Sequence, residues 1–169
     1  MKTRKMLLAR HRGVAAVEFG ILLVPMLLMV CGVAELGRAI YQFDTLTKGT
    51  RSAARYLSQF SPLDVSYPTG QAKCLAVYGN TSCSGSALST GLKTSMVVIC
   101  DRVDASGCPG MSFANVSTYD NSTGTGTPAG TINLVAVKIT GYTYSPIQTF
   151  INASGLTFTD IATVMRQVL

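Results

Sequence analysis

The sequence from Gly13 to Ala34, GVAAVEFGILLVPMLLMVCGVA, decides how this chain is organised, because Glu18 is its only charged residue. From Val14 onward the apolar stretch has 21 residues, which as a helix measures roughly 31 Å and matches the hydrocarbon thickness of a bilayer. The stretch therefore predicts a membrane-spanning helix. A carboxylate inside or near hydrocarbon is costly, so Glu18 marks a candidate functional position.

A secretory signal peptide is the alternative interpretation of this stretch. Signal peptides have an apolar core of about 7 to 15 residues that closes on a small-residue cleavage site. No Ala-x-Ala-like site occurs here before Glu35, so a retained helix is favoured. Five basic residues and no acid precede it: Lys2, Arg4, Lys5, Arg10 and Arg12. The positive-inside rule then places the N-terminus in the cytoplasm and exports the rest of the chain.

The basic composition follows from this topology. Of the formal net charge of +6, five units lie in residues 1–13, which leaves +1 for the remainder. The lysines and arginines of the exported part are scattered and do not cluster with aromatic residues, as a nucleic-acid footprint would require. No nucleic-acid partner is expected.

Cysteine usage agrees with export. Cys31 lies in the apolar stretch and is interpreted as a small apolar residue. Cys74, Cys83, Cys100 and Cys108 form an even set in a region expected to face an oxidising compartment. Three pairings are open, and two local bridges, the first cysteine with the second and the third with the fourth, are preferred because each closes a short loop. Since no Cys-x-x-Cys spacing occurs, a metal or redox centre is disfavoured.

Helical periodicity continues beyond the apolar stretch. Pro25 should kink or loosen the membrane part of the helix, and Ser61-Pro62 should end the helical pattern. Glu35 with Arg38, and Asp44 with Lys48, have the spacing of helical ion pairs. Apolar or small residues recur at steps of three and four, and this stripe is predicted to lie on the folded domain; its residues are Leu36, Ile40, Phe43, Leu46, Thr50, Ala53 and Leu57.

These patterns divide the chain into four parts and predict one helix from about Val14 to about Ser58. The parts are a basic leader at 1–13, a transmembrane helix at 14–34, an amphipathic continuation at 35–60 and an exported domain at 61–169. The exported part can bury a modest core that the bridges and the long helix supplement. The expected fold class is α+β, with a long N-terminal helix packed on a small antiparallel sheet in a pilin-like, single-pass membrane protein.

Within the exported domain, three strands are predicted, at Ser95–Val103, Leu134–Tyr144 and Leu156–Met165. The second should place Val135, Val137 and Ile139 on one face. The third carries Asp160 on the face of Leu156, Phe158 and Ala162, so a bulge, an edge position or a polar contact has to accommodate it. A short helix is predicted at Gln71–Tyr78 and a long surface loop at Asn115–Gly130, which is rich in Ser, Thr, Asn and Gly.

Candidate catalytic groups are scarce in the exported part. The only histidine is His11, which lies in the leader on the other side of the membrane, so no exported serine or cysteine has a histidine base. Asp101 and Asp104 could suggest a calcium site, but no further acidic ligand lies nearby, and they are interpreted as turn formers. No enzyme activity, metal or cofactor is expected.

Four segments resemble a known family. Arg12 to Phe19 (RGVAAVEF), Leu22 to Leu28 (LLVPMLL), Glu35 to Arg38 (ELGR) and Ala53 to Tyr56 (AARY) are similar to the TadE type of pseudopilin from bacterial tight-adherence (Tad) pilus systems, within the wider type IV pilin class. The resemblance is strong over residues 10–58, weaker from about 132 to 168, and absent between them.

The resemblance implies a mechanism. A prepilin peptidase of the inner membrane would cut between Gly13 and Val14, so that Glu18 becomes the fifth residue, followed by Phe19. Glu18 would then pair with the free α-amino group of a neighbouring subunit, which compensates a charge that lipid penalises. The exported domain would act by contact with other pilins, pseudopilins and the inner-membrane assembly platform, in pilus biogenesis, adhesion or secretion.

Two other functions stay open. One is an uncleaved, single-pass protein whose exported domain binds an envelope partner, with Glu18 as an interfacial residue without a partner. The other is a disulfide-active periplasmic enzyme, which requires a reactive thiol among the four exported cysteines.

Overall fold

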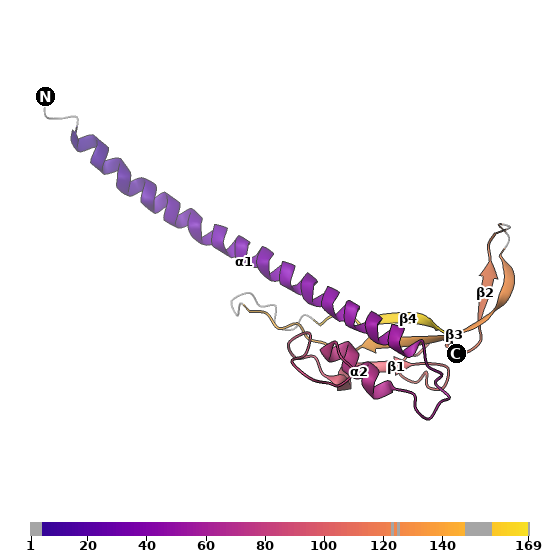
Figure 1. Ribbon diagram of the computed structural model, residues 1–169. Coiled ribbons are helices and arrows are strands. Elements are labelled where there is room, and N and C mark those ends of the chain that lie inside the picture. The colour runs from indigo at the N-terminus through magenta and orange to yellow at the C-terminus, as the bar shows by residue number, and fades with distance from the viewer. Residues whose placement is uncertain (1–4, 123, 125, 148–156, 169) are drawn as a thin grey trace.

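One helix and one small domain make up the computed structural model, which describes residues 5–122, 124, 126–147 and 157–168. Helix α1 (Lys5–Leu57) has a free N-terminal half, and its C-terminal half lies along the domain (Figure 1). Helix α1 begins before the expected Val14 and ends one residue before the expected Ser58. It continues through Pro25 without interruption, so the expected kink or loosening does not break it.

The sheet is antiparallel and built around β3 (Thr127–Ile139). Strands β1 (Val97–Cys100) and β4 (Ile161–Gln167) pair with the C-terminal half of β3, and β2 (Val116–Asp120) pairs with its N-terminal half. Strand β2 and its part of β3 project beyond the end of the domain as a two-stranded ribbon (Figure 1). The α+β class is confirmed, with an apolar N-terminal helix and a four-stranded sheet.

The main core lies between α1, α2 (Thr69–Tyr78) and one face of the sheet. Helix α1 contributes four fully buried apolar residues, which are Leu46, Ala53, Ala54 and Leu57. From β3, Val135, Val137 and Ile139 point into this core, as the alternation of the sequence predicted. Thr50 of α1 and Thr163 of β4 share a hydrogen bond of 2.9 Å between their hydroxyl oxygens. The amphipathic half of α1 is thus held by apolar burial and by one polar contact with β4.

The other face of the sheet carries a smaller core around a disulfide bond. Cys100 and Cys108 are bonded to each other, and they pack with Phe113 of the following loop and Ala136 of β3. Among the described residues, neither α1 nor α2 contributes to this smaller core. The disulfide-closed loop and Phe113 therefore supply the apolar cover that the two helices give on the first face.

The three predicted strands are present, but their predicted first or last residues were wrong. Strand β1 is shorter than Ser95–Val103, because Thr94–Met96 forms a 3₁₀ turn and Asp101 turns the chain away. Strand β3 ends at Ile139 instead of Tyr144, just before Gly141, whose φ of +67° belongs to the left-handed region. Strand β4 begins at Ile161 instead of Leu156, which lies outside the described residues, and it extends to Gln167.

Asp160 precedes β4 and forms an ion pair of 3.1 Å with Lys138. It is therefore accommodated by a polar contact outside the strand, which is one of the three options that its position left open. The short helix expected at Gln71–Tyr78 is confirmed, beginning two residues earlier at Thr69.

The loop predicted at Asn115–Gly130 was wrong, because it contains β2 and the first residues of β3. Its composition is rich in Ser, Thr and Gly, and its side chains are mostly exposed, so no buried apolar face appears in the sequence. The strands form here because β3 continues outward from the core and offers a backbone edge to which Val116–Asp120 hydrogen bonds.

Gly49 gives a test of the close approach between α1 and α2. A Cβ atom at this buried position would lie 2.6 Å from the carbonyl oxygen of Ala76 in α2. We expect Gly49→Ala to lower the free energy of unfolding by about 1–3 kcal/mol, because two backbones would have to separate. The measurement is thermal unfolding of the full chain in detergent micelles, followed by circular dichroism.

Gly37→Ala is the matched control, because Gly37 lies in the same helix and a Cβ atom there meets nothing within 4 Å. Alanine is the better helix former, so the control should keep or slightly raise the unfolding temperature. Equal effects of the two substitutions would contradict the tight packing at Gly49.

Candidate functional site

The residues predicted for processing and assembly lie together on the free half of α1. Gly13, Val14, Glu18 and Phe19 are all exposed, Val14 at 57% and Phe19 at 64%. A Cβ atom at Gly13 would meet nothing within 4 Å. This apolar part of α1 is long enough to cross a membrane, and none of it is buried within the protein. Among the described residues, the domain therefore neither covers nor contacts this end of the helix.

A second site, which the sequence analysis missed, lies where α1 meets the domain. Glu35 is only 7% exposed although it directly follows the apolar stretch. The Tyr144 hydroxyl donates a hydrogen bond of 2.6 Å to Oε1 of Glu35. The backbone N–H of Ile147 donates to the same oxygen at 3.0 Å. One carboxylate thus binds the segment Tyr142–Ile147, which we call the strap, to the helix.

Burial and the neighbouring Glu35 carboxylate raise the pKa of the Tyr144 hydroxyl to about 12. Burial is the larger cause, since a charged tyrosinate would lose water. The hydroxyl therefore stays protonated at neutral pH and remains a donor to Glu35.

Tyr142 holds the strap two turns further along α1. Its hydroxyl lies 3.2 Å from Oε1 of Gln42, 3.0 Å from the carbonyl oxygen of Thr90 and 2.7 Å from Oγ of Ser89. Its ring is stacked on Phe158, with 5.7 Å between the ring centroids. The strap therefore connects α1, the loop before β1 and the segment before β4.

The predicted apolar stripe of α1 is confirmed from Leu46 to Leu57 and wrong nearer the membrane. Leu36 is 62% exposed and Ile40 is 61% exposed, whereas the polar residues Glu35 and Gln42 are each only 7% exposed. The domain packs on the polar side of α1 here because the strap offers two tyrosine hydroxyls and a backbone N–H. The sequence offered only weak signals, namely the spacing of seven residues between Glu35 and Gln42, which puts them on one side of a helix, and the spacing of two residues between Tyr142 and Tyr144.

The two expected ion pairs on α1 have different outcomes. Lys48 lies 2.6 Å from Asp44, as the spacing predicted, and this hydrogen bond raises the pKa of Lys48. The expected ion pair of Glu35 with Arg38 is not found among the described residues. Glu35 binds the strap instead, and the Nη1 atom of Arg38 is buried without a hydrogen-bond partner in the described chain.

The structure joins Cys74 to Cys83 and Cys100 to Cys108, the two local pairs that the loop lengths favoured. Cys31 is free and lies on α1. Asp101 accepts hydrogen bonds from the backbone N–H groups of Val103 and Asp104, so it forms a turn, as predicted. Over the described ranges, no group of three or more His, Cys, Asp or Glu residues could hold a metal ion.

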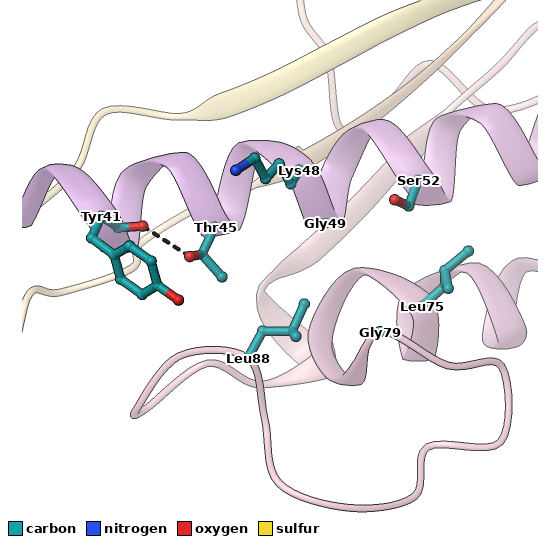
Figure 2. A pocket seen from close by; sticks show the side chains of 8 residues that line it. All are labelled: Tyr41, Thr45, Lys48, Gly49, Ser52, Leu75, Gly79 and Leu88. Atoms are coloured by element: carbon teal, nitrogen blue, oxygen red, sulfur yellow. Dashed lines mark hydrogen bonds between the residues drawn. The ribbon is translucent and has the colours of Figure 1, made fainter.

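A shallow groove of about 300 Å³ separates part of α1 from α2 (Figure 2). Tyr41 and Thr45 line one side, and Leu75 and Leu88 line the other. The hydroxyl of Thr45 is bonded to the carbonyl oxygen of Tyr41 at 2.8 Å. Lys48 is the charged residue of its lining and is already paired with Asp44. No histidine, cysteine or carboxylate is among the described residues that line the groove.

Together, the fold and these sites define an α+β protein with one candidate membrane-spanning helix and a small disulfide-bonded domain. Residues 13–55 match the family model of TadE-like proteins, which is consistent with a TadE-like protein of Tad pilus systems. The match begins at Gly13 and includes Glu18 and Glu35, but it excludes both tyrosines of the strap. No curated protein and no solved structure matches the chain.

The strap gives a test of Glu35. We expect Glu35→Ala to speed amide hydrogen exchange at Ile147 by about 10- to 150-fold, because the loss of a hydrogen bond to a charged group costs about 1.5–3 kcal/mol. Hydrogen exchange with mass spectrometry on the full chain in micelles measures this change.

Glu35→Gln is the matched control, since its amide oxygen can accept the same two hydrogen bonds. It should keep most of the protection. Exchange in α2, whose core contacts do not involve Glu35, should be unchanged in both variants. Unchanged exchange at Ile147 in Glu35→Ala would refute the attachment of the strap to α1 through Glu35.

Proposed function

We propose that this protein is a pseudopilin or minor pilin that takes part in assembly of a Tad-type pilus. The observation that carries the proposal is the family match over residues 13–55, which begins at Gly13, at the start of an uncovered apolar helix. The basic N-terminus would stay in the cytoplasm, α1 would cross the inner membrane once, and the disulfide-bonded domain would be exported.

Processing by a prepilin peptidase between Gly13 and Val14 is part of the proposal. Both residues are exposed, so the peptide bond between them is accessible to another protein. Both also lie inside α1, which begins at Lys5. Cleavage therefore requires local unwinding of the helix, and a glycine lowers the cost of that unwinding because it is a poor helix former.

Assembly would use Glu18 and the neighbouring Phe19. Glu18 has no salt-bridge partner among the described residues and is exposed on the apolar part of α1. A carboxylate in that position is unfavourable in lipid. The α-amino group of a neighbouring processed subunit would compensate this charge, so that pairing couples insertion of the subunit to contact with other pilins and the assembly platform. The domain would then contribute contacts rather than chemistry.

We expect the mature protein to begin at Val14. The measurement is N-terminal sequencing and intact mass of protein from native membranes that contain their own prepilin peptidase. Gly13→Ala should weaken processing, because alanine favours the helix and adds a side chain next to the bond. Gly20→Ala, at another uncovered glycine of α1, is the control and should be processed normally. A chain that keeps Met1 would favour an uncleaved anchor for an envelope-binding domain.

We expect Glu18→Ala to be processed normally and to be incorporated poorly into pili. The comparison variant is Ile21→Ala, which shortens another exposed side chain of the same helix, 68% exposed in the structure. Immunoblots of sheared pili and of membranes measure incorporation and retention. Normal piliation in the Glu18→Ala strain would refute the pairing role of this carboxylate.

A further inference from the structure

One face of α1 remains uncovered beyond the predicted membrane segment. Val33, Leu36 and Ile40 are 68%, 62% and 61% exposed, and they follow one another at helical steps of three and four. The domain is bound to the opposite face, through Glu35 and Gln42. The apolar surface of the membrane helix therefore continues past Ala34, but only on the side away from the domain.

The length of this face exceeds the thickness of a bilayer. From Val14 to Ile40 the helix is about 39 Å long, compared with a hydrocarbon core of about 30 Å. Long apolar helices adapt by tilting, within a range of about 0–40° from the membrane normal. Because only one face is extended, the tilt has a direction. Leaning toward the free face buries Leu36 and Ile40, whereas leaning toward the other face would press the strap into the lipid.

Beyond Ile40 the same face becomes basic. Asp44, Lys48, Arg51 and Arg55 follow at steps of four, four, three and four, and all four are exposed. Lys48 is paired with Asp44, whereas neither arginine takes part in an ion pair within the described residues. The face therefore has three cations and one anion just above the apolar residues. Anionic lipid headgroups attract basic segments placed in this way.

We propose that α1 tilts toward its free face, so that this face docks on the surface of an anionic phospholipid bilayer at Leu36 and Ile40. These two side chains enter the boundary between acyl chains and headgroups, and the cations Lys48, Arg51 and Arg55, which lie further out along the same face, are attracted to the lipid phosphates. The exported domain is then held above the membrane on the other side of the helix. This inference rests on the membrane anchoring in the proposed function and adds the orientation of the domain before assembly.

The absence of tryptophan from the chain allows a direct test. Single tryptophans replace Ile40, Leu27 or Val65 in the full-length protein. Leu27 is 52% exposed within the predicted span, and Val65 is fully exposed in the loop after α1. Each variant is reconstituted in vesicles of phosphatidylcholine and phosphatidylglycerol whose acyl chains are brominated, because bromine quenches tryptophan at membrane depth.

We expect Leu27→Trp to be strongly quenched, Ile40→Trp to lose roughly half of its emission and Val65→Trp to be unquenched. If the emission of Leu27→Trp is quenched and that of Ile40→Trp is not, the proposed docking of the free face is overturned while the membrane anchor is retained. An unquenched Leu27→Trp would overturn the membrane anchor itself, and with it the proposed function. If the emission of Ile40→Trp is not quenched by bromine but shifts to shorter wavelength as the protein concentration rises, the free face contacts a second copy of the chain and the proposed contact with lipid is overturned.

The cations are tested in the Ile40→Trp background with Arg51→Glu and Arg55→Glu together. Quenching on anionic vesicles should fall toward the level seen on pure phosphatidylcholine. Arg166→Glu, at an exposed arginine of β4, is the control and should leave the quenching unchanged. Equal quenching in all variants and on both lipids would overturn the role assigned to the phosphates.

Discussion

The rest of the structure depends on the burial of one side of α1, from Leu46 to Leu57, against α2 and β3. This contact covers the apolar face of the sheet, which carries Val135, Val137 and Ile139. It also connects the apolar N-terminal half of α1 to the domain core, because no break separates the two halves of α1. Close approach at Gly49 brings the backbones of α1 and α2 together and leaves no room for a side chain.

Between these two halves, the contacts become polar. Glu35 and Gln42 are buried under the strap, where they meet Tyr144 and Tyr142. Apolar packing alone would place few constraints on how the domain is rotated about α1, whereas a carboxylate with two directed donors selects one orientation. This selection leaves the opposite face of α1 free over two further turns. The contacts of the strap with Glu35 and Gln42 and the free face of α1 therefore have one cause, namely the side of the helix that the domain covers.

Sequence periodicity predicted the elements whose environment is uniform. Val135, Val137 and Ile139 alternate because one face of β3 is buried, and the short helix at α2 is likewise found close to its predicted position. Prediction was wrong for β2, which is exposed and is formed by backbone pairing with β3. It was also wrong for Leu36 and Ile40, because periodicity shows that one face is apolar but does not show whether lipid, another protein or the domain covers it. The strap was missed for a related reason, since Glu35 and Tyr144 are 109 residues apart in the chain and only the fold brings them together.

By itself, the sequence determined that this chain has one helix able to span a membrane, with an isolated carboxylate at its start and a small domain of mixed class after it. Composition and local spacing suffice for these features, because hydrophobic length, flanking charge and short cysteine loops act between residues that are close in the chain. Only the tertiary structure decided which side of α1 the domain covers, how the outer ribbon forms and where Glu35 finds its donors. Those features depend on contacts between segments that are distant in the chain, and a local pattern in the sequence does not show which distant segment a side chain will meet.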